Sequence, residues 1–385
     1  MFQRYEIAVA DAVTTGKIAG AVALVTDRQG VTYEHAAGLR GVGGSAPMDT
    51  ATLFWIASMT KAIVSVAALQ LVERGKLSLD GDLSELLPDL KDLEVLEGID
   101  PTGAPRLRPA RGVVTLRKLL THTSGFGYGF TSADLTAYAE HLGIALIDDT
   151  RKSLRQPLLF DPGQGWLYGI GIDWAGVAVE AASGQRLDAY LIENVFGPLG
   201  MVDTGFDIAG DRAGRTVAVH GRSPDGALIE IPFGMPPNPE MLSGGGGLYS
   251  TARDYGRFLR MLLGGGQLDG ARVISEATAR GLADVQTGGH RAGVWTSAQP
   301  SMSHDLDLYP QMLAGHGLAT LVTPDPTGDG RSAGSLAWAG LANTYYWADP
   351  TAGVAGVLLT QSLPFADPEV LALLRVLERD AYAAL

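Results

Sequence analysis

A serine and a lysine stand three residues apart in residues 58–61, SMTK. A serine hydroxyl is a weak nucleophile until a neighbouring base accepts its proton. Residues i and i+3 lie on one face of a helix, so this spacing places the Lys61 amine beside the Ser58 hydroxyl. At a helix N-terminus, Ser58 would also gain from the helix dipole and from free backbone N–H groups. The pair is a candidate nucleophile and base, although the pattern alone is also typical of a capped surface helix.

A tyrosine that follows a tight turn is the second candidate, in residues 160–168, FDPGQGWLY. The Pro-Gly turn reverses the chain, and Trp166 and Tyr168 then project to one side. An ammonium beside a tyrosine favours the phenolate form. Tyr168 is therefore a candidate general base whose charge Lys61 would balance. In isolation, this tyrosine would be interpreted as a core residue with a bonded hydroxyl.

The third candidate is a strand with small residues, residues 336–341, LAWAGL. Its alanines and Gly340 would let a substrate backbone approach closely. Taken alone, this segment would be interpreted as an ordinary core strand.

The helices and strands that must position these residues are predicted from the periodicity of apolar side chains. Residues 58–74 predict a helix that is apolar nearly all round, as in a buried helix, with Gly75 as its stop. Residues 2–15 predict a first helix, and a final helix starts near Asp367. Strands are predicted at 19–26, 31–38, 316–323, 335–341, 344–347 and 354–361.

This order of elements predicts an α/β (α+β) fold whose single sheet is built from both ends of the chain. We expect residues 1–90 and 245–385 to form a discontinuous α/β domain with an antiparallel sheet. Residues 91–244 would form a mainly helical domain with loops, and the active site would lie in the cleft between the two.

Composition excludes several classes of function. The chain has 385 residues, 18% of them charged, and a formal net charge of −13, which argues against nucleic-acid binding. Without cysteine it has no disulfide or thiolate site, and its seven histidines are scattered, so we expect no metal. No apolar run is long enough to span a membrane, and the first residues lack a signal-peptide core. We expect a cytoplasmic protein.

Residues 330–334, GRSAG, match the nucleophile elbow of α/β-hydrolases. That motif requires a strand-to-helix turn and a histidine later in the chain. Ser332 precedes a predicted strand, and the last histidine is His316. We therefore reject Ser332 as the nucleophile.

Taken together and in this order, the three candidate segments resemble the three motifs of the penicillin-recognising serine hydrolases. This superfamily comprises the class C β-lactamases, the DD-peptidases and the family VIII carboxylesterases. Residues 119–125, LLTHTSG, and residues 243–251, SGGGGLYST, resemble further segments of that family. The resemblance covers nearly the whole chain and implies the β-lactamase/penicillin-binding-protein-like fold. It also suggests that His122 is a structural hydrogen-bonding residue rather than a base.

The resemblance implies a two-step acyl transfer without a metal or organic cofactor. Ser58 would attack the carbonyl, with Lys61 and Tyr168 as the pair that handles protons. The backbone N–H groups of Ser58 and Leu341 would hold the oxyanion. Which of Lys61 and Tyr168 is the acylation base stays open, because coupled groups titrate as a pair.

Two departures from the β-lactamase pattern predict an esterase. The usual Tyr-x-Asn is replaced by Tyr168-Gly169-Ile170, and the usual Lys-Thr-Gly by Trp338-Ala339-Gly340. The lysine of that motif helps to bind a substrate carboxylate, and an indole ring cannot replace it. We therefore expect a serine carboxylesterase for uncharged, short-acyl esters, with weak or no β-lactamase activity.

The expected substrate site is an aromatic, apolar cleft for a small-molecule ester. Tyr128 would either hydrogen-bond near the nucleophile or simply pack there. An acyltransferase or amidase on the same scaffold, and a non-catalytic sensor, remain alternatives, and the oligomeric state is open. The residues expected to bind substrate are Tyr128, Trp338, Gly340, Ile170, Phe126 and Trp166.

Overall fold

The computed structural model describes residues 1–44, 46–144, 150–236 and 239–385, and its central element is a seven-stranded antiparallel sheet. The strand order is β13-β14-β15-β16-β17-β1-β2. β1 pairs with β17, so the two ends of the chain meet inside one sheet, as the sequence predicted. The strands are β13 (Gly315–His316), β14 (Leu321–Thr323), β15 (Ser335–Gly340), β16 (Thr344–Asp349), β17 (Val354–Leu359), β1 (Gly20–Asp27) and β2 (Val31–Gly38).

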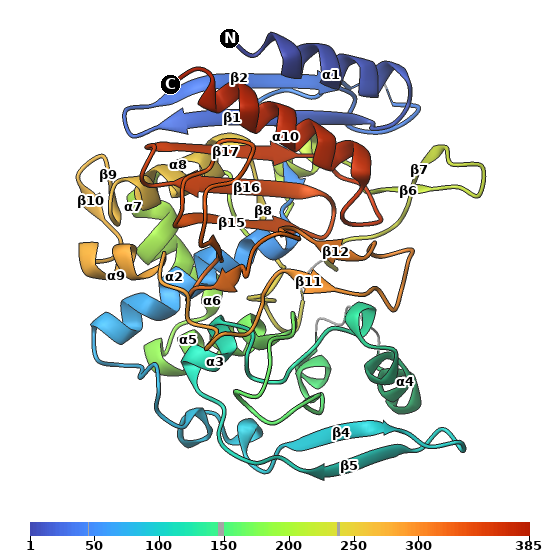
Figure 1. Cartoon of the computed structure of the whole chain (residues 1–385), viewed down its shortest axis with the longest axis vertical. Coiled ribbons are helices and arrows are strands. Elements are labelled where there is room, and N and C mark those ends of the chain that lie inside the picture. Colours follow the sequence, from blue (N-terminus) through green and yellow to red (C-terminus); the bar gives the residue numbers. More distant parts are fainter. Residues whose placement is uncertain (45, 145–149, 237–238) are drawn as a thin grey trace.

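Helices cover both faces of this sheet. α1 (Gln3–Thr14) and α10 (Pro368–Tyr382) pack against each other and against the β1–β2–β17 side, where Figure 1 shows them in blue and red. α8 (Ala252–Leu263) contacts β1, β16 and β17 from the opposite side. Because both faces are covered, every residue of β15, β16 and β17 is buried.

The helix that carries Lys61 and directly follows the turn with Ser58 is buried over most of its length. α2 (Thr60–Glu73) is buried from Thr60 to Leu71, in agreement with its apolar pattern, and Gly75 follows it with a positive φ. α5 (Gly171–Ser183) packs on α2 and on α3 (Leu116–Leu120). The other helices are α4 (Ala133–Leu142), α6 (Leu187–Leu191), α7 (Gly197–Leu199) and α9 (Glu276–Gly281).

Short strand pairs lie outside the large sheet. The pair β4–β5 forms a hairpin inside the region that was expected to be mainly helical, far from the sheet in Figure 1. Its turn is closed by the Asp100 carboxylate, which accepts hydrogen bonds from the N–H groups of Thr102 and Ala104. The pairs are β3 (Phe54–Trp55) with β8 (Tyr249–Ser250), β4 (Glu94–Ile99) with β5 (Pro105–Pro109), β6 (His220–Arg222) with β7 (Leu228–Glu230), β9 (Gln267–Leu268) with β10 (Ala271–Arg272), and β11 (Val294–Trp295) with β12 (Leu306–Asp307).

The prediction of one strand over 316–323 was wrong. The chain reverses there, because the Gly317 N–H donates to the Thr320 carbonyl, and β13 and β14 are two short antiparallel strands. Leu318 and Ala319 in the turn are buried, which is why the segment resembled a continuous strand. The domain boundaries at 90/91 and 244/245 stay predictions.

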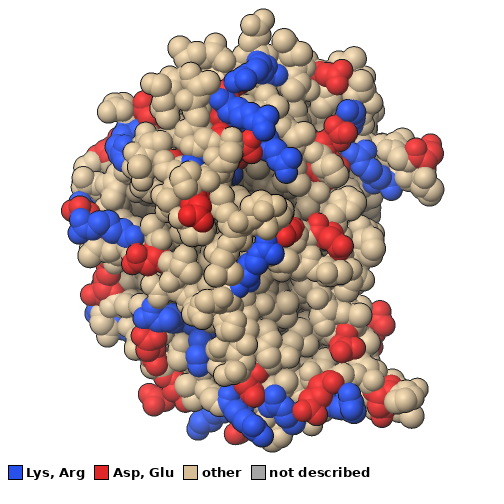
Figure 2. Space-filling view, viewed as in Figure 1, with Lys and Arg blue, Asp and Glu red and all other residues tan. Residues whose placement is uncertain are grey.

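The surface in Figure 2 carries acidic and basic side chains interspersed, with no continuous basic patch on that face. Among the described residues, no helix combines the length and the apolar character needed to cross a membrane.

Candidate active site

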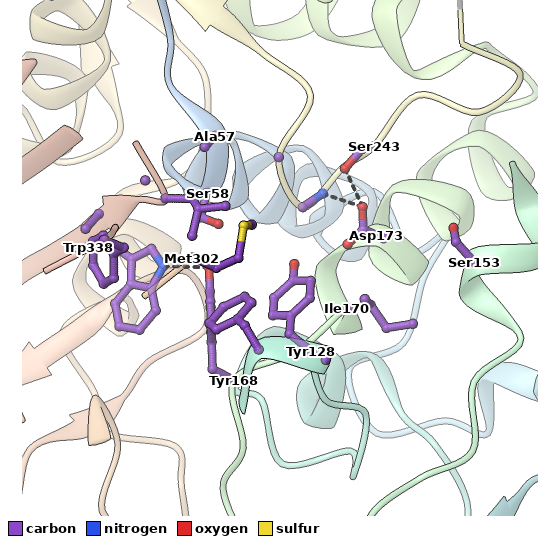
Figure 3. Close-up of a pocket in the computed structure, with 18 of the residues that line it drawn as sticks. Ala57, Ser58, Tyr128, Ser153, Tyr168, Ile170, Asp173, Ser243, Met302 and Trp338 are labelled. Carbon is purple, nitrogen blue, oxygen red and sulfur yellow. Dashed lines mark hydrogen bonds between the residues drawn. The ribbon is translucent and has the colours of Figure 1, made fainter. Parts of the chain in front are cut away.

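Ser58 lies in a single 3₁₀ turn, Ala57–Met59, that connects β3 to the first turn of α2. Ala57 has a φ of 43°, a left-handed conformation that a residue with a side chain rarely adopts. Such strain persists only where surrounding structure enforces it. Figure 3 shows the Ser58 hydroxyl pointing into a cavity that the Tyr128 and Tyr168 hydroxyls also face. The fold therefore fixes this serine at the wall of a cavity.

Lys61 is buried, with 1% of its surface exposed, and its ammonium is surrounded by three oxygen atoms. Its Nζ lies 3.1 Å from Ser58 Oγ, 2.9 Å from Tyr128 Oη and 2.6 Å from the Gly245 carbonyl oxygen. Three acceptors match the three N–H donors of an ammonium. The i, i+3 spacing thus brings the lysine to the serine hydroxyl.

The two tyrosines occupy different places around Lys61. Tyr128, whose role was left open, bonds the amine directly, whereas Tyr168 presents its ring, with Nζ 4.9 Å from the ring centroid. The Tyr168 hydroxyl instead accepts a hydrogen bond from Trp338 Nε1 at 3.3 Å. Burial, followed by the nearby Asp173 carboxylate, raises the pKa of Tyr128 well above its usual value. Tyr128 is therefore a neutral partner of the lysine at ordinary pH.

β15 forms the wall opposite Tyr128, and Trp338, Gly340 and Leu341 all line the cavity. A side chain at 340 would place its Cβ 2.3 Å from the Ile56 carbonyl oxygen, so only glycine lets β15 approach the nucleophile turn. Ser58 and Leu341, the residues expected to form the oxyanion hole, thus border one cavity. Their catalytic role stays a prediction.

The cavity has a volume of about 130 Å³ and a predominantly apolar lining. Trp295, which sequence analysis missed, stacks on Tyr168 with ring centroids 5.4 Å apart. No local signal identifies it, because it comes from β11, far along the chain. The cavity is also lined by Trp55, Phe130, Leu154, Ile170, Met235, Met241, Met302, Leu306, Leu308 and Phe365.

Phe126 and Trp166, two of the expected substrate-binding residues, do not line the cavity. Gly169 packs directly on the backbone of Phe126, since a Cβ at 169 would lie 2.2 Å from the Phe126 carbonyl oxygen. The Phe126 ring is buried in the core against Trp174. Trp166 lies beside the His122 ring. The expected contact of these two side chains with substrate is therefore absent from the cavity lining.

Asp173 is a functional candidate that sequence analysis missed. It is the only residue with a formally charged side chain among the cavity-lining residues in the described part of the chain. Its Oδ1 accepts hydrogen bonds from Ser243 Oγ at 2.7 Å and from the Gly245 N–H at 2.9 Å. The available signal was an acidic residue in the first turn of the helix that follows the Tyr168 motif.

His122 differs from the expectation that it is a structural hydrogen-bonding residue. Within the described ranges, neither ring nitrogen has a hydrogen-bond partner; the ring packs on Tyr168 and His316 at centroid distances of 4.9 and 5.0 Å. Burial, followed by electrostatic interaction with His316 and with Lys61, lowers the pKa of His122 well below its usual value. The His122 backbone adopts a φ of 58°, and its carbonyl accepts the Leu167 N–H. No group of three or more side chains in the described ranges is arranged to hold a metal.

Ser332 of the rejected elbow motif lies outside the cavity lining. Its N–H donates to the Asp349 carboxylate, and its neighbour Arg331 forms a buried ion pair with Glu378 of α10. This segment is part of the contact between the sheet and α10.

Comparison with known proteins places the chain in a family. The family model described as Beta-lactamase matches residues 7–380. Monacolin J acid methylbutanoyltransferase of Aspergillus terreus is 34% identical over 402 residues, which cover 98% of this chain and 95% of that protein. Lovastatin esterase of Penicillium rubens is 33% identical over 374 residues, covering 94% and 93%. A mutant simvastatin synthase from Aspergillus terreus superimposes with a TM-score of 0.85 at 31% identity, covering 99% of this chain and 96% of that one.

Proposed function

The chain belongs to the beta-lactamase family of serine hydrolases and acyltransferases, and we propose that it is a serine carboxylesterase for uncharged, short-acyl esters. One observation carries the proposal: Ser58 Oγ lies 3.1 Å from the Lys61 amine at the wall of an apolar cavity. A nucleophile in contact with a buried amine is the arrangement that activates a serine hydroxyl.

The first chemical step forms an acyl-enzyme. Ser58 Oγ bonds to the ester carbonyl carbon, and its proton moves to the coupled pair Lys61 and Tyr168. The N–H groups of Ser58 and Leu341 stabilise the oxyanion; one such donor typically contributes about 3–4 kcal/mol. The ester C–O bond then breaks, and the pair returns the proton to the departing alcohol.

The second step regenerates the serine. Water attacks the acyl carbon, the same pair accepts its proton, and the carboxylic acid leaves as Ser58 recovers its hydrogen. Hydrolysis and transfer share the acyl-enzyme and differ only in the acceptor, water or an alcohol. The relatives named as a methylbutanoyltransferase and as an esterase make alcohol transfer the second candidate function.

The lining of the cavity supports substrates without a negative charge. Trp338 occupies the motif position where β-lactamases carry a lysine, and Asp173 is the sole formal charge of the described lining. A carboxylate brought there would be desolvated without a cation, which is costly. The volume of about 130 Å³ is close to that of a cavity that holds benzene, which fits a short acyl group.

The test is hydrolysis of p-nitrophenyl acetate and butyrate by the wild type and by Ser58→Ala, with a chromogenic cephalosporin beside them. We expect ester turnover that disappears in the variant, and little cephalosporin cleavage. Added alcohol separates the two candidates, because faster acyl-enzyme breakdown with ester product indicates transfer. Efficient cephalosporin turnover would overturn the proposed specificity, and wild-type enzyme inert toward both esters would overturn hydrolysis of simple esters.

A further inference from the structure

The ammonium of Lys61 is buried without a carboxylate in direct contact. None of the ion pairs found among the described residues includes Lys61, and its three hydrogen-bond acceptors are two hydroxyls and a carbonyl. A buried charge without an opposite charge nearby is strongly unfavourable. The fold must therefore balance this ammonium through another group.

Asp173 reaches Lys61 through the backbone of one residue, Gly245. The Asp173 carboxylate accepts the Gly245 N–H at 2.9 Å, and the Gly245 carbonyl accepts a hydrogen from Lys61 Nζ at 2.6 Å. The N–H and the carbonyl of Gly245 belong to adjacent peptide groups joined at its Cα, so the carboxylate fixes the orientation of this residue and thereby aims its carbonyl at Nζ. The carboxylate and the ammonium are thus held on the same residue, and the negative charge acts on the ammonium across space.

The local structure is built around this carboxylate. Asp173 stands in the first turn of α5, where the helix dipole stabilises a negative charge. A side chain at 245 would place its Cβ 2.2 Å from Asp173 Oδ2, so the carboxylate lies flat against this glycine. The Ser243 hydroxyl donates to Oδ1, the same oxygen that accepts the Gly245 N–H, as the dashed lines in Figure 3 show.

The other titratable groups around Lys61 do not supply a negative charge. Tyr128 bonds the amine, but burial raises its pKa well above the usual value, so it is neutral. His122 and His316 are uncharged at neutral pH, because burial lowers the pKa of both. Tyr168 turns its ring face toward Nζ and its hydroxyl toward Trp338. Among the described residues, Asp173 is the remaining acidic side chain that faces the Lys61 ammonium.

We propose that Asp173 is a positioning residue for Lys61: it holds the Gly245 backbone so that Nζ is aimed at Ser58, and its negative charge balances the ammonium across space. The inference rests on the proposed role of Ser58 and Lys61 as nucleophile and proton carrier. The Asp173 carboxylate favours the protonated form of the Lys61–Tyr168 pair, whichever member loses the proton. Removing its charge therefore makes the pair lose a proton at lower pH.

The test measures the pH dependence of Ser58 labelling by a fluorophosphonate, together with that of kcat/KM for p-nitrophenyl butyrate. Asp173→Asn keeps an oxygen that accepts the Gly245 N–H and removes the charge. We expect the acidic midpoint of both profiles to move down by about one pH unit. Ser243→Ala is the matched control, because it removes a partner of the same carboxylate and leaves the charge; its midpoint should stay within about 0.3 units.

Asp173→Ala removes the acceptor as well as the charge. Its plateau rate should fall by about tenfold more than that of Asp173→Asn, because the Gly245 peptide is no longer held. Should Asp173→Asn not fold, Asp173→Ser provides the uncharged variant, with a small hydroxyl that helix first turns accept.

The outcomes separate this inference from the proposed function. Suppose that the wild type is labelled at Ser58 but the pH profiles of the folded, uncharged variants keep the wild-type midpoint. This result would overturn the role of Asp173 and leave the assignment of Ser58 as nucleophile intact. The same holds if Ser243→Ala shifts the midpoint as far as Asp173→Asn. A wild type that is not labelled at Ser58 would overturn both.

Discussion

Two buried cations, Lys61 and Arg331, sit in this fold in opposite electrical settings. Arg331 lies in residues 330–334, whose sequence matches the nucleophile-elbow motif. Its Nε donates a hydrogen bond to the Glu378 carboxylate at 3.0 Å, and a terminal guanidinium nitrogen donates to Tyr309 Oη at 2.8 Å. Both side chains of that ion pair are more than nine-tenths buried. Lys61 is equally buried, but every oxygen it contacts directly is formally neutral.

The difference separates a structural charge from one available for chemistry. A cation in direct contact with a carboxylate keeps its proton, and the pair binds two elements together. An ammonium among hydroxyls and a carbonyl can release a proton to a neighbour with little rearrangement. The fold thus neutralises one buried cation fully and leaves the other balanced at a distance, where Ser58 can exchange a proton with it.

The two serines beside these cations give the largest expected difference. Ser58→Ala removes the nucleophile, so kcat/KM for p-nitrophenyl butyrate should fall on the order of 10⁴-fold or more. Ser332→Ala, at the structural cation, should leave kcat/KM within about twofold. Steady-state kinetics on both purified variants decide this. Loss of activity in Ser332→Ala with retention in Ser58→Ala would reverse the assignment of the two regions.

Replacing Lys61, the proposed catalytic cation, separates activity from stability. Lys61→Met should lower kcat/KM on the order of 10³-fold, since Ser58 loses its proton partner. The free energy of unfolding should fall by less than in Glu378→Gln, because Asp173 does not contact Lys61 directly and its carboxylate keeps the hydrogen bonds from Ser243 and Gly245. Urea denaturation beside kinetics measures both quantities. A large loss of stability would mean that Lys61 is mainly a structural residue.

The structural cation should behave in the opposite way. Glu378→Gln leaves the Arg331 guanidinium buried without its counter-charge, which typically costs about 3–5 kcal/mol. We expect a lower midpoint of urea unfolding, while kcat/KM per folded molecule stays within about twofold. If stability were unchanged and activity lost, the comparison between the two cations would fail.

Much of the fold followed from local patterns. The all-round apolar character of residues 60–71 and the strand patterns at both chain ends were sufficient to predict the buried helix and a shared sheet. The hairpin β4–β5 was missed because it depends on a turn closed by Asp100, and the periodicity of apolar residues does not predict such a turn. The turn inside 316–323 was missed because its residues are buried like those of a strand.

The site was predictable where short spacing along the chain determines contact, as for Ser58 in the 3₁₀ turn and Lys61 in the first turn of α2. It was not predictable where contact depends on the packing of distant segments. Tyr128 bonds the Lys61 amine through its hydroxyl, whereas Tyr168 contacts it through its ring, and this difference depends on how the two segments pack around Lys61. Asp173 acts through a glycine 72 residues away, and Trp295 comes from a separate strand pair.

Acid should destabilise the catalytic side of the fold through its buried histidines. Burial lowers the pKa of His316 to about 4, whereas the unfolded chain protonates near 6.5. Below pH 6.5 the unfolded state binds the proton first, so the free energy of unfolding falls until about pH 4. One such group accounts for about 3 kcal/mol over this window. His122 shifts in the same direction.

Urea denaturation between pH 7 and pH 4 measures this loss, and His316→Gln is the comparison variant. The variant should lose less stability on acidification than the wild type, by about 2 kcal/mol or more. Equal slopes in the two proteins would show that the acid sensitivity arises elsewhere.

The smallest expected effect concerns the strained turn at the nucleophile. Ala57 holds a φ of 43°, and Asp92, in a loop far along the chain from Ser58, holds one of 51°. Glycine adopts this region freely, so Ala57→Gly and Asp92→Gly should each stabilise the fold by about 1 kcal/mol after the entropy of glycine is subtracted. At Ala57 the gain should come with a loss of about three- to tenfold in kcat, because a freer backbone no longer holds Ser58 Oγ against Lys61. At Asp92 kcat should be unchanged. Equal kinetics in the two variants would show that the strain at Ala57 does not serve the nucleophile.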